Sequence, residues 1–181
     1  MNVIFLDFDG VLDTIHDASP ETIEKRIITL AHICCKYNCK VVIESTMKDV
    51  IDEETLETEN EWVKFILDTL KKHGIDCIGR TPTIRKKLND YTYIPVWKED
   101  EIRAYLLKHP EISHYCIIDD DDLGCRHSGL NKIRNHLVQT LYYSNNTEEE
   151  GLLPKHEEQV GEALQKENEI QKLTLKKKKS L

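Results

Sequence analysis

Aspartates stand at two points of the sequence where a run of apolar residues ends. Asp7 and Asp9 follow the first apolar run of the chain, and Gly10 comes directly after them. Asp119 and Asp120 open a run of four aspartates that follows the apolar stretch "YCII". A strand that only fills a core has no need to end in like charges. These carboxylates are therefore candidates for holding a cation or a phosphoryl group.

The expected cation is magnesium, because facing carboxylates repel each other unless a cation lies between them. Mg²⁺ prefers hard oxygen ligands, keeps several waters and also takes a phosphate oxygen. A calcium-binding loop is the competing interpretation of "DFDGVLD". Counted from Asp7, that loop needs oxygen ligands at its fifth and twelfth positions. Val11 and Ala18 stand there, and neither side chain can bind a metal, so the calcium interpretation fails.

An aspartate can also attack phosphorus and form an acyl phosphate that water later cleaves. That reaction needs a second acid to protonate the leaving oxygen and a cation to neutralise the phosphoryl oxygens. Asp7 and Asp9 can both face one pocket if the backbone turns at Gly10. Taken alone, the motif also fits a capped turn with solvated acids, and it leaves these two interpretations open.

The residues around the first motif predict a strand, a helix and a second strand. Residues 2–6 are apolar and β-prone, which indicates a buried strand. Ser19 precedes a proline and a glutamate, the usual start of a helix, and the helical apolar period continues to about Asn38. Residues 40–46 then form a second apolar run. A strand, crossover helix and strand favour a parallel pair.

Further apolar periods extend this alternation. They predict a helix whose apolar residues run from Trp62 to Leu70 and that ends at Gly74, a helix around 102–106, a strand that ends at Asp119, and an edge or late strand over 136–143. Strands that alternate with helices predict an α/β fold with a mainly parallel sheet covered on both faces.

Ligands of such sheets bind at the carboxyl ends of the strands. The polar residues at or just after the predicted strand ends are Asp7, Asp9, Ser45, Asp119 and Asp120. They come from three distant segments, so we expect them to converge on one edge of the sheet.

The composition indicates a globular domain rather than a membrane or secreted protein. The 181 residues fit one domain, no apolar run is long enough to span a bilayer, and the first residues lack the pattern of a secretory signal. We therefore expect a cytoplasmic protein. The six cysteines form no CxxC pair, which favours reduced thiols over a zinc site. The net charge of −8 argues against broad nucleic-acid binding.

The C-terminal part of the chain differs in composition from the rest. We predict a catalytic domain over residues 1–153 and a separate segment over 154–181. In that segment, residues 155–175 are typical of a charged helix with a weak apolar stripe, and Lys176–Lys179 form a basic tail. A solvated tail is the simpler interpretation, and a patch for nucleic acid, a membrane or a partner is the alternative.

Together, the motifs resemble those of the haloacid dehalogenase (HAD) superfamily, whose phosphatases begin with DxDGxL. Residues 7–12 have this form, and Ser45 in "VVIEST" fits the second motif, with Thr46 as the alternative. Lys98 in "VWKEDEI" fits the third, with Arg85, Lys86 and Lys87 as alternatives. "CIIDDDD" fits the fourth. The resemblance covers about residues 2–153 and is closest to the small HAD domains of RNA-repair proteins.

The resemblance implies a role for each residue. Asp7 would be the nucleophile and a Mg²⁺ ligand, and Asp9 the general acid and then base, which binds the metal through its backbone carbonyl. Asp120 would complete the metal site with Asp119 beside it. Ser45 and Lys98 would hold the phosphoryl group.

The resemblance also implies a phosphomonoester phosphatase with a HAD-like three-layer sandwich. Neither gap between the motifs is long enough for a large cap domain, so we expect an open site and a macromolecular substrate, such as a phosphoprotein with phosphotyrosine. Small phosphomonoesters, a polynucleotide end or a nucleotide remain alternative substrates. The candidates for a basic track near the pocket are Arg80, Arg85, Lys86 and Lys87. A non-catalytic metal-binding module is the other alternative. His16 is a weaker candidate for substrate contact, and the oligomeric state is open.

Overall fold

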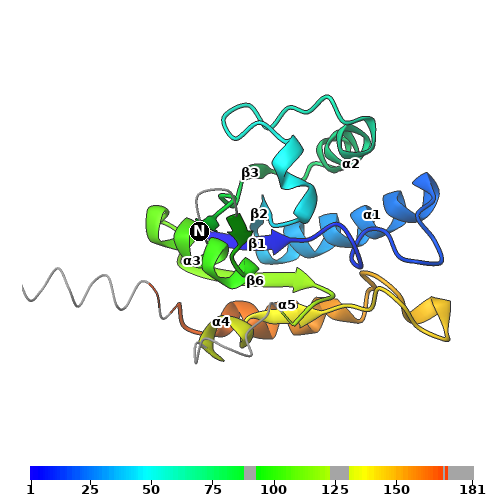
Figure 1. Cartoon of the computed structure of the whole chain (residues 1–181). Coiled ribbons are helices and arrows are strands. Elements are labelled where there is room, and N and C mark those ends of the chain that lie inside the picture. The colour runs from blue at the N-terminus through cyan, green and yellow to red at the C-terminus, as the bar shows by residue number, and fades with distance from the viewer. Residues whose placement is uncertain (88–92, 123–130, 169, 171–181) are drawn as a thin grey trace, which may run out of the picture.

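The computed structural model describes residues 1–87, 93–122, 131–168 and 170. Its central strands are β1 (Asn2–Leu6), β2 (Cys39–Ile43), β3 (Cys77–Arg80), β6 (His114–Asp119) and β7 (Leu137–Gln139). They form one sheet in the order β3-β2-β1-β6-β7, and each neighbouring pair is parallel (Figure 1). The predicted α/β fold with a mainly parallel sheet is confirmed, and the strand with the first motif lies at its centre.

Helices cover both faces of the sheet and give three layers (Figure 1). The helices on one face are α1 (Pro20–Tyr37), α2 (Glu61–Lys72) and α5 (His156–Gln165), and those on the other are α3 (Lys98–Lys108) and the short α4 (Asn131–Arg134). The side chains of β1 alternate between the two cores. Ile4 and Leu6 pack in the first core, while Val3 and Phe5 pack in the second.

The helix between β1 and β2 begins and ends as its sequence predicts. The Ser19 hydroxyl accepts a hydrogen bond from the Thr22 amide, and Asn38 closes α1 in a left-handed conformation with φ of 51°. This crossover brings β2 beside β1 in parallel, with Leu6 opposite Ile43. The ends of the two strands are therefore level, and so are the residues that follow them.

No large cap domain is inserted between the motifs. A single helix, α1, connects β1 to β2. Between β2 and α3 the chain forms a short 3-10 helix η1 (Thr46–Val50), then α2, β3 and a hairpin of β4 (Arg85–Lys87) and β5 (Tyr93–Pro95). These small elements agree with the prediction of a HAD-like fold without a large cap.

The predicted strand over 136–143 is only three residues long, as β7. It is an edge strand, as predicted, and it pairs with β6, but the chain leaves the sheet after Gln139. Instead, the Leu141 carbonyl accepts a hydrogen bond from the Gly151 amide, and the Tyr142 carbonyl accepts one from the Ile15 amide. The long apolar run misled the prediction because exposed side chains, including that of Tyr142, contribute to it.

The predicted helix over 155–175 is interrupted, because α5 ends at Gln165; residues 169 and 171–175 of that prediction lie outside the described residues. Lys166 has extended backbone angles, and the Asn168 side chain donates a hydrogen bond to the Ile112 carbonyl. This buried contact ties the chain to the loop before β6, where a continued helix could not lie. Val160 and Leu164 of α5 pack in the main core. The division of the chain after residue 153 stays a prediction, and Lys176–Lys179 lie outside the described residues.

Burial of His156 gives the fold a dependence on pH. The imidazole Nδ1 accepts a hydrogen bond from the Leu153 amide at 3.0 Å, and burial, with a smaller effect of Lys155, lowers the pKa of His156 to about 4. The unfolded chain binds this proton below pH 6.5, whereas the folded chain binds it only near pH 4. Stability should therefore rise with pH between about 4 and 6.5.

We expect acidification from pH 6.5 to 4 to remove about 3 kcal/mol of unfolding free energy through this one group. His156→Asn keeps an acceptor for the Leu153 amide but cannot titrate, so its urea midpoint should change less over this range. His32→Gln is the matched control at an exposed histidine. Equal pH dependence of His156→Asn and the wild type would contradict the assignment.

The cysteines agree with the expectation of reduced thiols. The described cysteines are free, and Cys34, Cys39 and Cys116 are buried. Burial raises the pKa of Cys34 and Cys39 to about 12, so both are neutral apolar side chains. In the described part of the chain, no helix is both long and apolar enough to cross a membrane.

Candidate active site

The sheet register brings the motif residues to one edge. Leu6, the last residue of β1, lies opposite Ile43 of β2 and Ile118 of β6. The backbone pairing continues past these residues, since the Asp7 amide donates to the Ile118 carbonyl at 3.0 Å. Asp7 and Asp119 therefore leave adjacent parallel strands at the same level, at their carboxyl ends.

The turn after β1 separates the side chains of the first motif. Asp7 is buried and faces the site, Phe8 packs in the core, and Asp9 is exposed. Gly10 follows with φ of 72°, and its carbonyl accepts a hydrogen bond from the Thr140 hydroxyl at 2.7 Å. The turn thus leaves Asp7 in the site and Asp9 exposed, and Thr140, the residue after β7, anchors it.

Gly10 leaves room for the Asp120 carboxylate. A Cβ atom at this position would lie 2.3 Å from the Asp120 Cγ atom, which is far inside van der Waals contact. The glycine is therefore needed for two reasons, its positive φ and the close approach of Asp120.

We expect Gly10→Ala to lose Mg²⁺ binding as well as stability. Gly74→Ala is a matched control, because Gly74 has φ of 74° and nothing within 4 Å of the added Cβ. Both variants should lose about 1 kcal/mol from the left-handed backbone. We expect Mg²⁺ to raise the melting temperature of the wild type and of Gly74→Ala, and we expect Gly10→Ala to lose that rise. Retention of that rise in Gly10→Ala would show that the close approach of Asp120 to Gly10 is not needed for Mg²⁺ binding.

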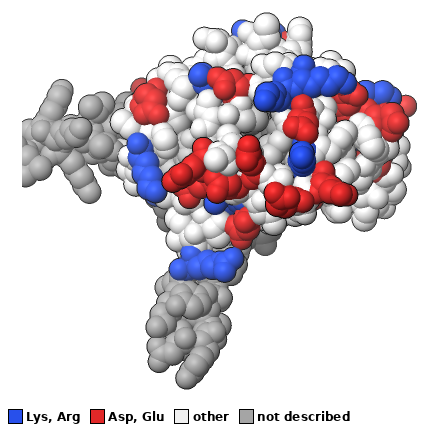
Figure 2. Space-filling view, turned by 90° about the horizontal axis from the view of Figure 1, so that it is seen from above, with Lys and Arg blue, Asp and Glu red and all other residues white. Residues whose placement is uncertain are grey.

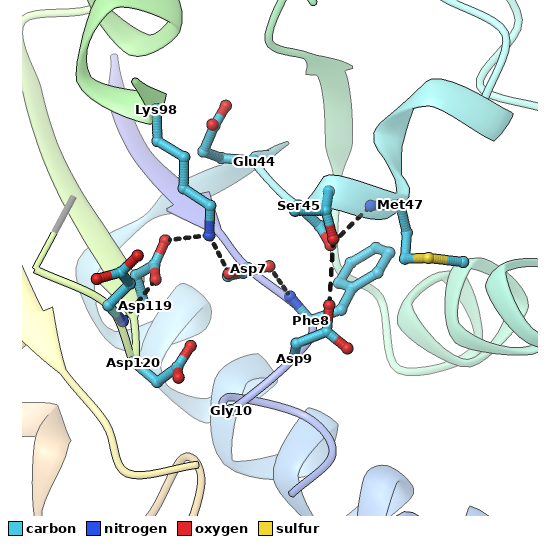
Figure 3. Close-up of polar contacts among 12 residues, drawn as sticks. Asp7, Phe8, Asp9, Gly10, Glu44, Ser45, Met47, Lys98, Asp119 and Asp120 are labelled. Atoms are coloured by element: carbon cyan, nitrogen blue, oxygen red, sulfur yellow. Dashed lines mark hydrogen bonds and ion pairs between the residues drawn. The ribbon is translucent and has the colours of Figure 1, made fainter. Parts of the chain in front are cut away.

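Lys98 joins the two groups of aspartates (Figure 3). It lies in the first turn of α3, and its ammonium contacts the Asp7 carboxylate and lies 2.8 Å from Asp119 Oδ2. Burial alone would lower the pKa of Lys98, but Asp7 and Asp119 raise it above its usual value. Lys98 is therefore charged. Of the alternatives for the third motif, Arg85 pairs with Asp49 instead, and the side chains of Lys86 and Lys87 lie outside the described residues.

The negative charge of the carboxylates around Lys98 is larger than the single positive charge of Lys98 can offset. Burial raises the pKa of Asp7 against the effect of Lys98. Burial, followed by repulsion from Asp7, raises the pKa of Asp119 to about 7, and the same two causes raise that of Asp120. Three carboxylates thus share one ammonium, and they ionise fully only if a further cation joins them.

The geometry of these carboxylates fits a divalent cation. Ligand oxygens of Asp7, Asp119 and Asp120 lie within 4.8 Å of one another. Asp119 already accepts hydrogen bonds from Lys98 and from the Asp121 amide. The Asp120 carboxylate takes a hydrogen bond from its own backbone amide, which opposes the rise in its pKa. A set of hard oxygen donors with excess negative charge suits Mg²⁺.

Asp9 and Ser45 lie on the other side of Asp7 from Asp119 and Asp120 (Figure 3). The Asp9 carboxylate accepts a hydrogen bond from the Thr46 hydroxyl at 3.3 Å and is not part of the carboxylate cluster. Its role as a metal ligand through the backbone carbonyl stays a prediction. Ser45 is fully buried, caps η1 by accepting from the Met47 amide, and its hydroxyl opposes the rise in the pKa of Asp7.

Sequence reasoning missed a buried ionic network behind the site. The Lys48 ammonium lies 3.2 Å from Glu44 and 2.6 Å from Glu101. The second Glu44 oxygen accepts from the Thr81 hydroxyl, and the second Glu101 oxygen accepts from the Ile84 amide at 2.7 Å. The i, i+4 spacing of Glu44 and Lys48 is a signal in the sequence, but it occurs as often on exposed surfaces.

Two of the basic residues suggested for a polynucleotide track lie beside acids. Arg80 is 3.9 Å from Glu53, and Arg85 is 3.3 Å from Asp49. Figure 2 shows aspartates and glutamates gathered over the middle of the face seen from above, with separate basic patches around them. His16 pairs with the buried Glu150 at 2.6 Å instead of reaching toward Asp7.

One family model matches most of the chain. The model described as "HAD domain in Swiss Army Knife RNA repair proteins" matches residues 3–150. No curated protein and no solved structure matches the chain. The matched range contains the carboxylates, Ser45 and Lys98, and HAD domains are as a class hydrolases and phosphatases. The chain therefore belongs to the family of HAD domains found in Swiss Army Knife RNA repair proteins.

Proposed function

We propose that the protein is a Mg²⁺-dependent phosphomonoester phosphatase that acts through an aspartyl phosphate. The observation that carries this proposal is the position of Asp7, which is buried, contacts the Lys98 ammonium and lies beside Asp119 and Asp120. A lone buried carboxylate would stay protonated, whereas one beside a lysine and a cation is ionised and can attack phosphorus.

The first step forms a bond between an Asp7 oxygen and phosphorus and breaks the bond to the leaving oxygen. Asp9 is exposed and donates its proton to that oxygen. In the second step Asp9 takes a proton from water, which attacks phosphorus and releases Asp7 and inorganic phosphate. Lys98 and the Ser45 hydroxyl lie on either side of Asp7, where they would hold the phosphoryl oxygens.

Mg²⁺ fits this scheme because the site already gathers three carboxylates for one ammonium. Asp7 and Asp120 would hold it with their side chains, Asp9 with its backbone carbonyl, and Asp119 would support the site through Lys98. When bound, the cation offsets the negative charge of the phosphoryl oxygens.

The substrate we propose is a phosphorylated macromolecule, in the cytoplasm. The absence of a large cap supports this, since a bulky substrate can then reach Asp7. A phosphoprotein with phosphotyrosine is the first candidate, and the acidic residues around the arginines favour it over a polynucleotide. A polynucleotide end is the second candidate, because the matched family is described by RNA repair proteins.

The experiment is hydrolysis of para-nitrophenyl phosphate with Mg²⁺ and with EDTA. We expect turnover with Mg²⁺ that EDTA removes and added Mg²⁺ restores. A phosphotyrosyl peptide and 3′- and 5′-phosphorylated oligonucleotides are then compared by kcat/KM. A higher value for the peptide supports the first candidate, and a higher value for an oligonucleotide supports the second. Turnover of none of these esters would favour a non-catalytic metal-binding module.

A further inference from the structure

Lys48 is a buried cation that does not touch the carboxylates proposed to react. Its side chain is 6% exposed, and its two partners, Glu44 and Glu101, are 0% and 7% exposed. Burying such a group costs free energy that the ion pairs alone seldom recover. A cation in this position therefore calls for an explanation in terms of geometry.

One end of the network belongs to the segment that holds Ser45. Glu44 is the residue before Ser45, and its amide continues the sheet by donating to the Leu6 carbonyl at 2.8 Å. Lys48 lies in η1, which the Ser45 hydroxyl caps. The 3.2 Å hydrogen bond from the Lys48 ammonium to Glu44 thus closes a small loop around Ser45 and fixes its backbone.

The other end belongs to the helix that carries Lys98. Glu101 follows Lys98 by three residues on α3, so both side chains lie on the same side of that helix. The 2.6 Å contact from Lys48 to Glu101 therefore sets the distance between α3 and the segment with Ser45. Glu101 also accepts from the Ile84 amide, which adds the chain that leads into the β4–β5 hairpin.

We propose that Lys48 is a positioning residue that holds Ser45 and Lys98 at a fixed separation around Asp7. The inference rests on the proposed function, in which these two groups hold the phosphoryl oxygens. Lys48 acts through Glu44 and Glu101 and contacts neither substrate nor metal.

The charges of the network support this role. Burial raises the pKa of Glu44 to about 8, so near pH 7 it is mostly protonated and can donate or accept without adding charge. Lys48 and Glu101 then form one balanced pair. The network stays neutral and does not compete with Asp7 and Asp119 for Lys98.

The test is Lys48→Met, which keeps the length of the side chain and removes its charge. Lys72→Met is the matched control, because Lys72 is 65% exposed and pairs with Glu24 on the surface. Turnover of para-nitrophenyl phosphate is measured with Mg²⁺. Binding of tungstate, a phosphate-shaped anion, is measured by calorimetry, and folding is followed by circular dichroism and thermal melting.

We expect folded Lys48→Met to lose kcat by about 10- to 100-fold, since a displacement of about 1 Å has effects of that size. KM should change less, and the tungstate affinity should fall in parallel with kcat. Lys48→Arg, which keeps the charge, should recover most of both. Lys72→Met should match the wild type. A residue that only stabilises the fold would lower the melting temperature and leave kcat and tungstate binding unchanged, and that result would overturn the proposal.

Glu101→Gln keeps the proposal testable if Lys48→Met does not fold. It releases α3 while Lys48 keeps Glu44, so kcat and tungstate affinity should fall in the same direction. Unchanged values in a folded Glu101→Gln would overturn the proposal. A wild type that binds tungstate but hydrolyses no phosphomonoester contradicts only the proposed function, and the tungstate comparison still decides the role of Lys48. A wild type that does neither overturns both.

Discussion

Asp7→Asn is expected to abolish turnover, by at least about 10³-fold in kcat, because the amide cannot form the acyl phosphate. The variant keeps the shape of the side chain, so binding of tungstate should weaken far less than turnover. The measurement is hydrolysis of para-nitrophenyl phosphate with saturating Mg²⁺. Asp68→Asn, an exposed aspartate on α2, is the matched control and should keep wild-type activity.

The same substitution should stabilise the protein in the absence of metal. The pKa of Asp7 is raised by burial, and Asp7 in turn raises that of Asp119. A carboxyl group whose pKa is raised by folding lowers the unfolding free energy of the protein as the pH rises from about 4 toward the folded pKa. Asp7→Asn removes one of them, so its unfolding free energy at pH 8 in EDTA should exceed that of the wild type by about 1 kcal/mol.

This pair of results separates the roles of Asp7. A nucleophile that is held against repulsion loses activity and gains stability when it is neutralised. A carboxylate that mainly anchors Lys98 would lose both. Retained turnover in Asp7→Asn would contradict the aspartyl-phosphate mechanism itself, whatever its stability.

The sequence allowed the central sheet to be predicted because its strands carry a strong local signal. The strand that ends at Leu6 and the one that ends at Asp119 are continuous apolar runs followed at once by acids. A helix with clear caps separates the first strand from the second. This order predicted that the two strands pair in parallel and that their carboxyl ends lie at the same edge of the sheet. This register is also what brings Asp7 and Asp119 to one edge.

The parts that failed depend on contacts between distant residues. The helix after residue 155 ends where the Asn168 side chain donates a hydrogen bond to the Ile112 carbonyl, and no local sequence pattern indicates that contact. The chain over 136–143 leaves the sheet because its carbonyl groups accept hydrogen bonds from the amides of Ile15 and Gly151 instead of from a strand. Propensities read from neighbouring residues in the sequence cannot predict either of these contacts.

The same limit explains why Lys48 was not recognised. In the sequence it is a lysine in a polar stretch, where a solvated side chain is the normal expectation. Its partner Glu101 is 53 residues away on α3, and only the packing of that helix makes the pair visible. The residues proposed to react follow strand ends, which the sequence marks, whereas the residue proposed to position them has no such mark in the sequence.

Lys98→Met should cause the largest loss of stability among the site variants, in addition to a loss of kcat of about 10² or more. Within the described residues, Lys98 is the cation that contacts both Asp7 and Asp119. Its removal leaves two buried carboxylates without compensation. Breaking such a buried pair lowers the unfolding free energy by about 3 kcal/mol.

The sign of the pH dependence tests this account. In the wild type the pKa of Asp119 is already raised to about 7, and without Lys98 it should rise further. The folded variant then binds protons that the unfolded chain releases above about pH 4, so its stability must fall as the pH rises. The deficit against the wild type should be small at pH 5.5 and large at pH 8.

Urea denaturation of Lys98→Met in EDTA at these two pH values measures the effect, with Lys64→Met on the exposed side of α2 as the control. Added Mg²⁺ should then raise the melting temperature of Lys98→Met more than that of the wild type, because the cation meets carboxylates that no lysine offsets. A deficit that is equal at both pH values would mean that Lys98 contributes packing rather than charge. In that case the carboxylates of Asp7 and Asp119 would not depend on it for ionisation, and the electrostatic basis for its role in the site would fall.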